Sequence, residues 1–98
     1  MKAEALLRSG KAGDALTLVN DLRSKRSAKA LASVTENAMF EEIGRELYWE
    51  GGKRTVEIRF GKFTNGTGTL IKDGYTVLFP VPSSAIVSNP NLKQNKGY

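Results

Sequence analysis

Glu46 and Glu50 are the first place where the sequence could carry out chemistry. They are one helical turn apart, so one carboxyl group could donate a proton while the other accepts one. Carboxylates at this spacing more often pair with nearby cations, and Arg45, Lys53 and Arg54 are close in the sequence. We therefore predict a structural role for Glu46 and Glu50, and no catalytic residue.

Tyr48 and Trp49 lie between these carboxylates and are the candidates for ligand binding. A flat aromatic face suits the apolar side of a pyranose, so either ring could stack on a sugar. A large aromatic residue near a helix end more often packs against the protein. Packing is the interpretation that we favour.

A glycine-containing loop, NGTGT at residues 65–69, could also be taken for a site. It lacks the G-x-x-x-x-G-K-[ST] pattern that cradles phosphate, so no phosphate site is expected. Asn65-Gly66-Thr67 matches a glycosylation sequon, a short motif that often occurs by chance.

The composition excludes several classes of active site. The 98 residues contain no cysteine and no histidine, so there is no thiolate, no disulfide and no imidazole base or ligand. We expect no enzyme activity, no cofactor and no metal. The apolar runs are too short to span a bilayer, and no signal peptide opens the chain. We expect this segment to be soluble, with no direct membrane insertion.

The net charge of +5 suggests nucleic acid as a partner. Basic residues concentrate in the first third, at Lys2, Arg8, Lys11, Arg23, Lys25, Arg26 and Lys29. The aromatic residues all follow Lys29, whereas a nucleic-acid module would interleave the two types. We therefore predict a solvated surface and no nucleic-acid binding.

The central element is a predicted helix at residues 35–52. Thr35 is its expected N-cap, and Ser33 with Glu36 is an alternative capping box. A glycine pair, Gly51-Gly52, is expected to end it. The predicted apolar stripe consists of Met39, Phe40, Ile43, Leu47 and Gly51. On the polar side, Glu41 and Glu42 are expected to pair with Arg45.

A helical hairpin is predicted at residues 1–26. Its helices are Met1–Ser9 and Ala12–Arg26, with Gly10 in the turn. The turn resembles that of a tetratricopeptide repeat, and no second copy follows. Because the first helix has no cap, we expect the chain to begin partway through a longer protein.

An irregular arm is predicted at residues 53–98. Apolar and polar residues alternate over Thr55–Phe60, which predicts a strand, and Tyr75–Phe79 is a second strand-like run. Ser83 could cap one helical turn. The fold class is therefore mainly α: a tetratricopeptide-like hairpin, one long helix and an arm with possible short strands or helical turns, all in a single segment, 1–98.

Two stretches carry a family resemblance: RELYWEGGKRTVEIRFGKF at residues 45–63 and LFPVPSSAIVSNPNLKQNKGY at residues 78–98. With the hairpin sequence, they resemble the C-terminal portion of the SusD/RagB family, whose motifs are ELxxEGxRxxDLIRFGKF, LFPIP and NPNLxQNPGY. The matched residues are Glu46, Leu47, Glu50, Gly51, Arg59, Phe60, Gly61, Leu78, Pro80, Pro82, Asn89, Pro90, Asn91, Leu92, Gln94, Asn95, Gly97 and Tyr98.

The chain departs from this pattern at three places. Lys53 replaces an arginine, Val56-Glu57 replaces Asp-Leu, and Lys96 replaces a proline. The first two could alter ion pairs beneath the central helix, and the third should loosen the tail. The resemblance implies a short helix after Gly51, whereas the alternation favours a strand, so both alternatives stay open.

The resemblance implies a function as well as a fold. Family members are nutrient-binding lipoproteins of the Bacteroidetes outer membrane that serve polysaccharide utilisation. They capture glycans for a SusC-like TonB-dependent transporter. The resemblance implies that this segment is non-catalytic scaffold and that the ligand platform and lipid anchor lie elsewhere.

A second interpretation is a free-standing helical interaction module. Apolar residues of the hairpin, Leu6, Leu7, Leu16 and Val19, could remain exposed and dock a partner or drive self-association.

Overall fold

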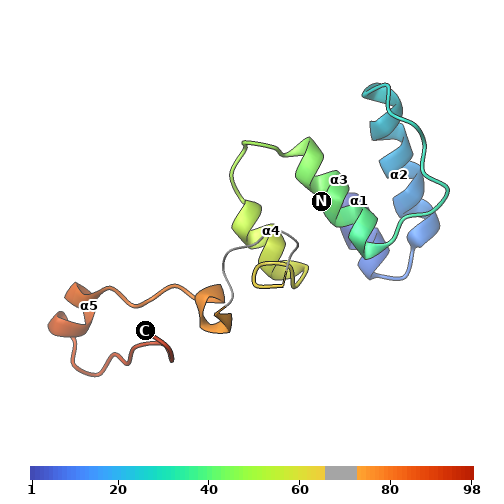
Figure 1. Cartoon of the computed structure of the whole chain (residues 1–98). Coiled ribbons are helices and arrows are strands. Elements are labelled where there is room, and N and C mark those ends of the chain that lie inside the picture. The colour runs from blue at the N-terminus through green and yellow to red at the C-terminus, as the bar shows by residue number, and fades with distance from the viewer. Residues whose placement is uncertain (66–72) are drawn as a thin grey trace. The chain divides into compact units, whose positions relative to one another are not determined.

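The computed structural model describes residues 1–65 and 73–98, and every regular element there is helical (Figure 1). The elements are α1 (Lys2–Arg8), α2 (Ala12–Lys25), α3 (Glu36–Glu46), α4 (Lys53–Arg59), the 3-10 helix η1 (Gly74–Val77) and α5 (Ser83–Ser88). They fall in two compact units, Met1–Lys53 and Arg54–Tyr98. The predicted mainly-α fold class is confirmed. Of the NGTGT loop and its sequon, all but Asn65 lies outside the described residues.

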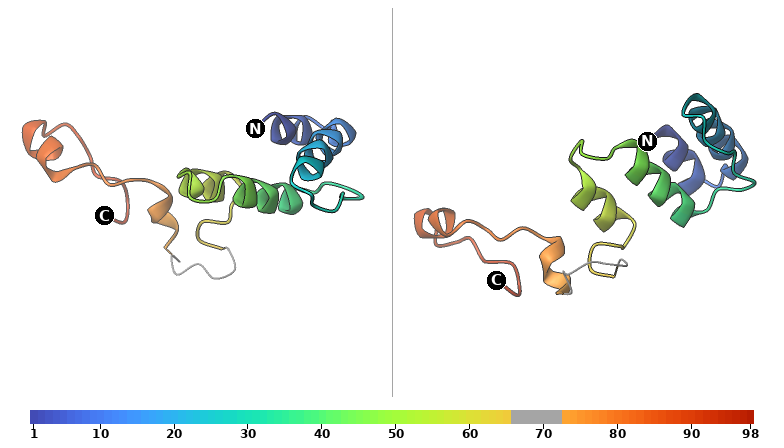
Figure 2. Two further views of the ribbon diagram at one scale, coloured as in Figure 1. Left: turned by 90° about the horizontal axis from the view of Figure 1, so that it is seen from above. Right: turned by 45° about the horizontal axis from the view of Figure 1, so that its top comes forward.

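The N-terminal unit begins with the predicted helical hairpin, α1 and α2 (Figure 2). Gly10 adopts a φ of +80°, the left-handed conformation that glycine favours. The amides of Gly10 and Lys11 donate to the carbonyls of Leu7 and Leu6 at 3.1 and 2.9 Å. This is a Schellman motif, and it explains why α1 stops and the chain reverses.

α2 ends in the same way, although without a glycine. Ser27 has a φ of +54°, and its amide donates to the Ser24 carbonyl at 3.0 Å. The connector that follows is attached to α2 by Asn20. Its side-chain amide donates to the Leu31 carbonyl at 3.0 Å, and its oxygen accepts from the Leu31 amide at 2.8 Å. Arg23 of α2 also holds the connector, because its Nε donates to the Lys29 carbonyl at 2.6 Å.

α3 begins where the sequence predicts and ends earlier. The Thr35 hydroxyl accepts from the Ala38 amide at 3.1 Å, so Thr35 rather than Ser33 is the N-cap. The predicted end at Gly51-Gly52 is wrong, because α3 stops at Glu46, with Leu47 as its C-cap. The chain turns at residues 47–50 before it reaches those glycines, so the helix ends six residues before the predicted end at Gly52.

The core of the N-terminal unit is small and apolar. Its buried residues are Ala15, Val19, Val34, Met39 and Ile43. The predicted stripe of α3 is therefore correct for Met39 and Ile43, but Leu47 is 38% exposed. The expectation that Val19 is exposed for docking is wrong, because only 3% of it is accessible. Leu6, Leu7 and Leu16 are half-buried.

In the C-terminal unit, the predicted strand at Thr55–Phe60 is wrong, because the chain forms α4 there. The alternation covers only six residues, which is too few to separate the two periodicities. In the helix, Val56 and Phe60 share one face at a spacing of four residues. Gly61, with a φ of +66°, ends α4 in a further Schellman motif, as its amide donates to the Ile58 carbonyl at 3.0 Å.

The second predicted strand, Tyr75–Phe79, is also wrong. The chain makes the 3-10 turn η1 and then runs extended through Leu78, whose ψ is 155°. The predicted helical turn after Ser83 is confirmed as α5, although its N-cap is Pro82 and Ser83 is its first residue.

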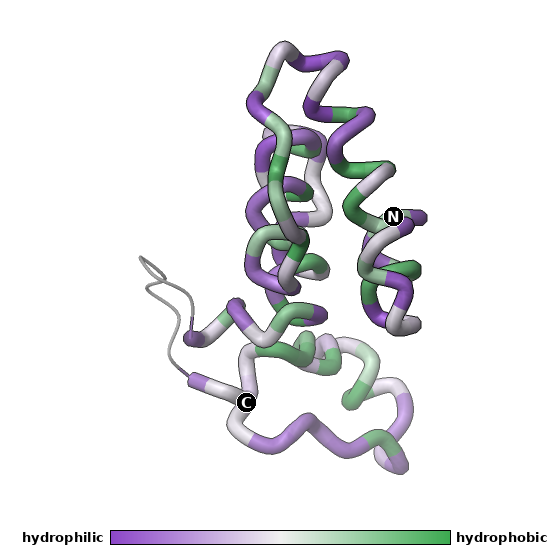
Figure 3. The backbone as a smooth tube through the Cα atoms, turned by 90° about the vertical axis from the view of Figure 1, so that its right-hand side faces the viewer, coloured by the Kyte–Doolittle hydropathy of each residue, from purple (hydrophilic) through white to green (hydrophobic). Residues whose placement is uncertain are grey.

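Hydrophobic and hydrophilic residues are interleaved along the helices of the described chain (Figure 3). Among residues 1–65 and 73–98, no helix combines the length and apolar character that crossing a bilayer requires.

Candidate functional site

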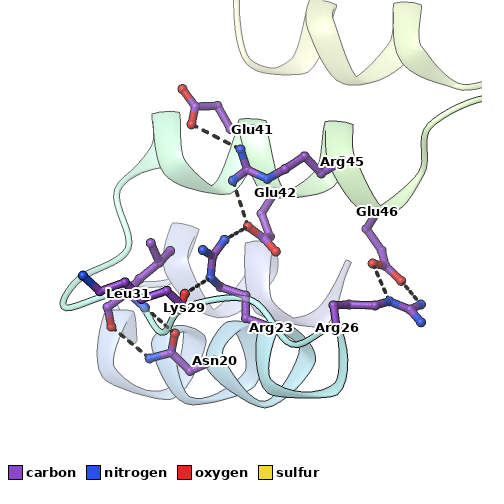
Figure 4. A network of polar contacts seen from close by, with 9 residues as sticks. All are labelled: Asn20, Arg23, Arg26, Lys29, Leu31, Glu41, Glu42, Arg45 and Glu46. Atoms are coloured by element: carbon purple, nitrogen blue, oxygen red, sulfur yellow. Dashed lines mark hydrogen bonds and ion pairs between the residues drawn. The ribbon is translucent and has the colours of Figure 1, made fainter.

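The densest cluster of charged side chains in the N-terminal unit joins α2 to α3. Figure 4 shows the arginines of α2 pointing toward the carboxylates of α3. Glu42 is its centre: its Oε2 accepts from Arg23 Nη1 at 2.7 Å and from Arg45 Nη2 at 2.9 Å. Arg45 also lies 3.7 Å from Glu41. The predicted pairing of both glutamates with Arg45 is confirmed.

Glu42 is buried, with 9% of the residue accessible. Burial raises the pKa of its carboxyl, but the hydrogen bonds and charges of Arg45 and Arg23 outweigh burial and hold the pKa below its ordinary value of 4.5. Glu42 is therefore an anion that binds two helices together.

Glu46 pairs with α2, not with the nearby residues in sequence. Arg26 donates to both oxygens, at 2.6 Å from Nη2 and 3.2 Å from Nε. This two-point geometry suits a guanidinium and a carboxylate. The hydrogen bond from Arg26 lowers the pKa of Glu46, and the hydrogen bond to Glu46 raises the pKa of Arg26. A carboxyl held ionised is a poor proton donor, which agrees with the structural role predicted for Glu46.

An open groove of about 600 Å³ lies over this cluster. Its lining residues are Arg23, Arg26, Ala28, Leu31, Glu42, Arg45 and Glu46. Each of the three arginines there donates to a carboxylate of the same cluster. The three arginines are thus engaged with two carboxylates, Glu42 and Glu46, as expected for contacts between helices.

Tyr48 and Trp49 are among the most exposed apolar side chains of the described residues, at 73% and 88%. Their rings meet edge to face, with centroids 6.0 Å apart and planes at 85°. The packing that we favoured for them is not seen within the described residues. Whether they bind a ligand stays a prediction.

The backbone at Trp49 is unusual. The Glu50 amide donates to the Leu47 carbonyl at 3.1 Å and closes a turn in which Trp49 has a φ of +65°. This is a glycine-like position, and a bulky residue there costs about 1–2 kcal/mol. Glu50 and Gly51 follow it and are exposed.

In the C-terminal unit, Arg54 of α4 is the central side chain. Its Nη2 donates to the carbonyls of Thr76 and Val77, at 2.6 and 3.1 Å. Its guanidinium lies 3.9 Å from the centroid of the Phe79 ring and 5.0 Å from that of Phe63. Arg54 therefore ties α4 to η1 through the two carbonyls and to the segment after η1 through Phe79. The sequence suggested Arg54 only as a partner for Glu46 or Glu50, and nothing in it pointed to backbone carbonyls 22 residues away.

The two family motifs of this unit bind each other through side chains of the tail. Gln94 accepts from the Val81 amide at 2.8 Å and donates to the Val81 carbonyl at 2.9 Å. Asn95 donates to the Phe79 carbonyl at 2.7 Å. The Tyr98 hydroxyl donates to the Leu78 carbonyl at 2.8 Å. We call these three side chains, Gln94, Asn95 and Tyr98, the tail clasp.

Other motif residues shape the chain around the clasp. Pro80 and Pro82 flank Val81, so Val81 supplies the amide that Gln94 needs. Asn89 accepts from the Asn91 amide at 3.1 Å, in a turn that contains Pro90. The remaining charged motif residue, Arg59, lies 5.9 Å from the Phe60 ring.

Gly97 lets the end of the chain close over Tyr75. Its φ is +103°, and an added Cβ would lie 2.7 Å from Cδ1 of Tyr75. The Tyr75 and Tyr98 rings meet edge to face at 4.9 Å. The tail is thus anchored on both sides of Lys96, where the sequence predicted loosening.

The described residues hold no group of three acidic side chains that could bind a metal ion. Their polar side chains pair with one another and with the backbone, as in a helical scaffold.

Comparison with known proteins agrees with the sequence motifs. No family model matches the chain. The chain is 36% identical to the starch-binding protein SusD of Bacteroides thetaiotaomicron over 99% of its own length. It spans 19% of the length of that relative. The chain therefore belongs to the SusD-like family, as its motifs predicted.

Proposed function

We propose that the chain is a non-catalytic scaffold segment of a SusD-like protein that binds a glycan nutrient at the outer membrane. The observation that carries this proposal is the 36% identity to a starch-binding protein across 99% of the chain. The glycan class, the membrane location and a TonB-dependent transporter as partner come from the family resemblance.

The structure supports the scaffold role through its contacts. In the N-terminal unit, Glu42 and Glu46 of α3 accept three guanidinium hydrogen bonds from Arg23 of α2 and Arg26, the C-cap of α2. In the C-terminal unit, Arg54 and the tail clasp, whose three residues belong to a family motif, bind backbone carbonyls. Glu46, one of the two carboxylates whose spacing suggested acid–base chemistry, is held ionised by Arg26, which lowers its pKa.

A chimera tests this role. The chain replaces the segment that it matches in the Bacteroides thetaiotaomicron protein, and migration is measured in gels that contain starch. We expect a folded chimera that starch retards as strongly as the parent protein. A chimera that lacks two of the three tail-clasp side chains, Gln94→Ala with Asn95→Ala, is the control and should fold less stably. A folded chimera that starch does not retard would contradict the proposal.

The partner is tested on the whole protein that contains this chain. Purification from outer membranes in mild detergent, followed by mass spectrometry, should recover a TonB-dependent transporter. Recovery of the protein without any transporter, or from the cytoplasm, would argue against this part of the proposal.

A further inference from the structure

We propose that Trp49, with Tyr48 beside it, is a stacking contact for one sugar ring of the glycan. The inference rests on the proposed function and assigns this chain a direct part in it. Trp49 is the single tryptophan of the chain and is 88% exposed, so packing in the described residues does not explain its presence.

The backbone gives an independent reason to single out Trp49. Its φ of +65° lies in the left-handed region, at the position of the turn that glycine would occupy without strain. Gly51 and Gly52 follow immediately, with φ values of +76° and +72°. Glycine thus occupies the next two left-handed positions, whereas a bulky residue occupies this one. Within residues 1–65 and 73–98, a strained residue that stays exposed points to function as its explanation.

The chemistry around the ring favours a sugar over an apolar protein segment. The Tyr48 ring lies at 85° to the indole plane. The two rings are therefore nearly perpendicular, and a sugar that stacks on one ring would have the other ring at its side. The indole N–H, the Tyr48 hydroxyl and the Glu50 carboxylate belong to three consecutive exposed residues. A pyranose offers C–H groups to the flat face and hydroxyl groups to these polar atoms. An apolar segment would bury the same atoms without hydrogen bonds, which is unfavourable.

Because Trp49 is the only tryptophan, its fluorescence reports on this site alone. The 98-residue chain is titrated with maltohexaose, an α-1,4-linked glucose oligosaccharide. We expect a saturable change in emission with a roughly millimolar dissociation constant, as suits a single contact. N-acetyltryptophanamide in the same titration corrects for bulk effects. Emission that does not change beyond this control would overturn the proposal.

Two variants separate binding from folding, with amide chemical shifts of Gly51 and Gly52 as the measure of binding. Trp49→Phe keeps a stacking face and should keep most of the affinity. Trp49→Gly suits the backbone and should not lower the melting temperature, yet it should weaken binding at least about tenfold. Unchanged binding in Trp49→Gly would refute the stacking contact. The contact would also be refuted if Trp49→Gly had a lower melting temperature but its folded molecules bound maltohexaose with unchanged affinity. Trp49 would then serve folding and not binding.

The outcomes distinguish this inference from the proposed function. If starch retards the chimera and Trp49→Gly changes nothing, the scaffold role stands and the stacking contact is wrong. If emission responds to maltohexaose in the isolated chain but starch does not retard the folded chimera, the stacking contact stands without the scaffold role.

Discussion

At Gly97, a missing side chain allows two tyrosines to meet. The left-handed backbone there brings the last residue back, so that Tyr98 contacts Tyr75 and reaches the Leu78 carbonyl. A motif glycine thus has a steric reason to be glycine.

Gly97→Ala should destabilise the C-terminal unit by about 1–3 kcal/mol, because the new methyl group overlaps the Tyr75 ring. This loss in the free energy of unfolding is measured by urea unfolding, which is followed by the near-ultraviolet circular dichroism of the tyrosines. Gly61→Ala is the matched control: Gly61 also has a positive φ, +66°, but nothing lies within 4 Å of its added Cβ, so it has the backbone strain without the overlap and should cost less. Equal effects of the two substitutions would show that steric overlap is not the cause.

Arg54 combines two hydrogen bonds to carbonyls with stacking on Phe79. Arg54→Lys keeps the charge but loses the planar group, so we expect a loss of about 1 kcal/mol in the stability of the same unit. Arg54→Ala, which removes the hydrogen bonds, the charge and the stacking together, should lose more than Arg54→Lys. Urea unfolding of both variants decides the order, and an unchanged stability of Arg54→Ala would contradict the assignment.

At the scale of elements, the contact between α2 and α3 depends on a buried charge. Glu42→Gln leaves Arg23 and Arg45 with a neutral partner and should lower the free energy of unfolding by about 1–3 kcal/mol. Glu41→Gln on the same helix is the control and should cost less, because Glu41 is exposed. Thermal or urea unfolding at neutral pH measures both.

The ion pairs of Glu42 with Arg23 and Arg45 make the stability of the fold depend on pH, and the direction follows from the pKa of Glu42. The pKa of Glu42 is lower in the folded chain than its ordinary 4.5, so its stabilising effect is present above pH 4.5 and is lost as the pH falls through the folded pKa. Unfolding free energies measured from pH 7 downward should therefore decline more steeply for the wild type than for Glu42→Gln. Parallel curves would contradict this.

The sequence predicted the elements whose signals are local. The hairpin and the start of α3 follow from periodicity, Gly10 and Thr35, all within a few residues of one another. The strand at Thr55–Phe60 was wrong because short alternation fits either periodicity, while the family resemblance indicated the helix correctly. The tail clasp was not predictable, because Gln94 and Val81 are 13 residues apart and unlike in type. The pairing of Glu46 with Arg26 was missed for the same reason, at 20 residues.

At the scale of the whole molecule, the net charge of +5 overstates the free positive charge of the first third. Four of its seven basic residues pair with carboxylates: Arg8 with Glu4, Arg23 with Glu42, Lys25 with Asp21 and Arg26 with Glu46. The positive charge of the first third is thus largely paired, which makes this part of the chain a weak binder of a polyanion.

We therefore expect the chain to elute from heparin below about 0.15 M salt, where screening is only moderate. The double variant Asp21→Asn, Glu46→Gln frees Lys25 and Arg26 and should elute later. Strong retention of the wild type at higher salt would support nucleic acid as a partner instead.

The tail clasp has a consequence for how molecules of this protein meet each other. An extended, hydrophobic segment such as Leu78–Val81 normally offers backbone groups on which a foreign strand can add and start aggregation. Here Gln94 occupies both groups of Val81, as a neighbouring strand would, and the flanking prolines have no amide to offer. The segment is therefore closed to strand recruitment even though Leu78 and Phe79 remain exposed.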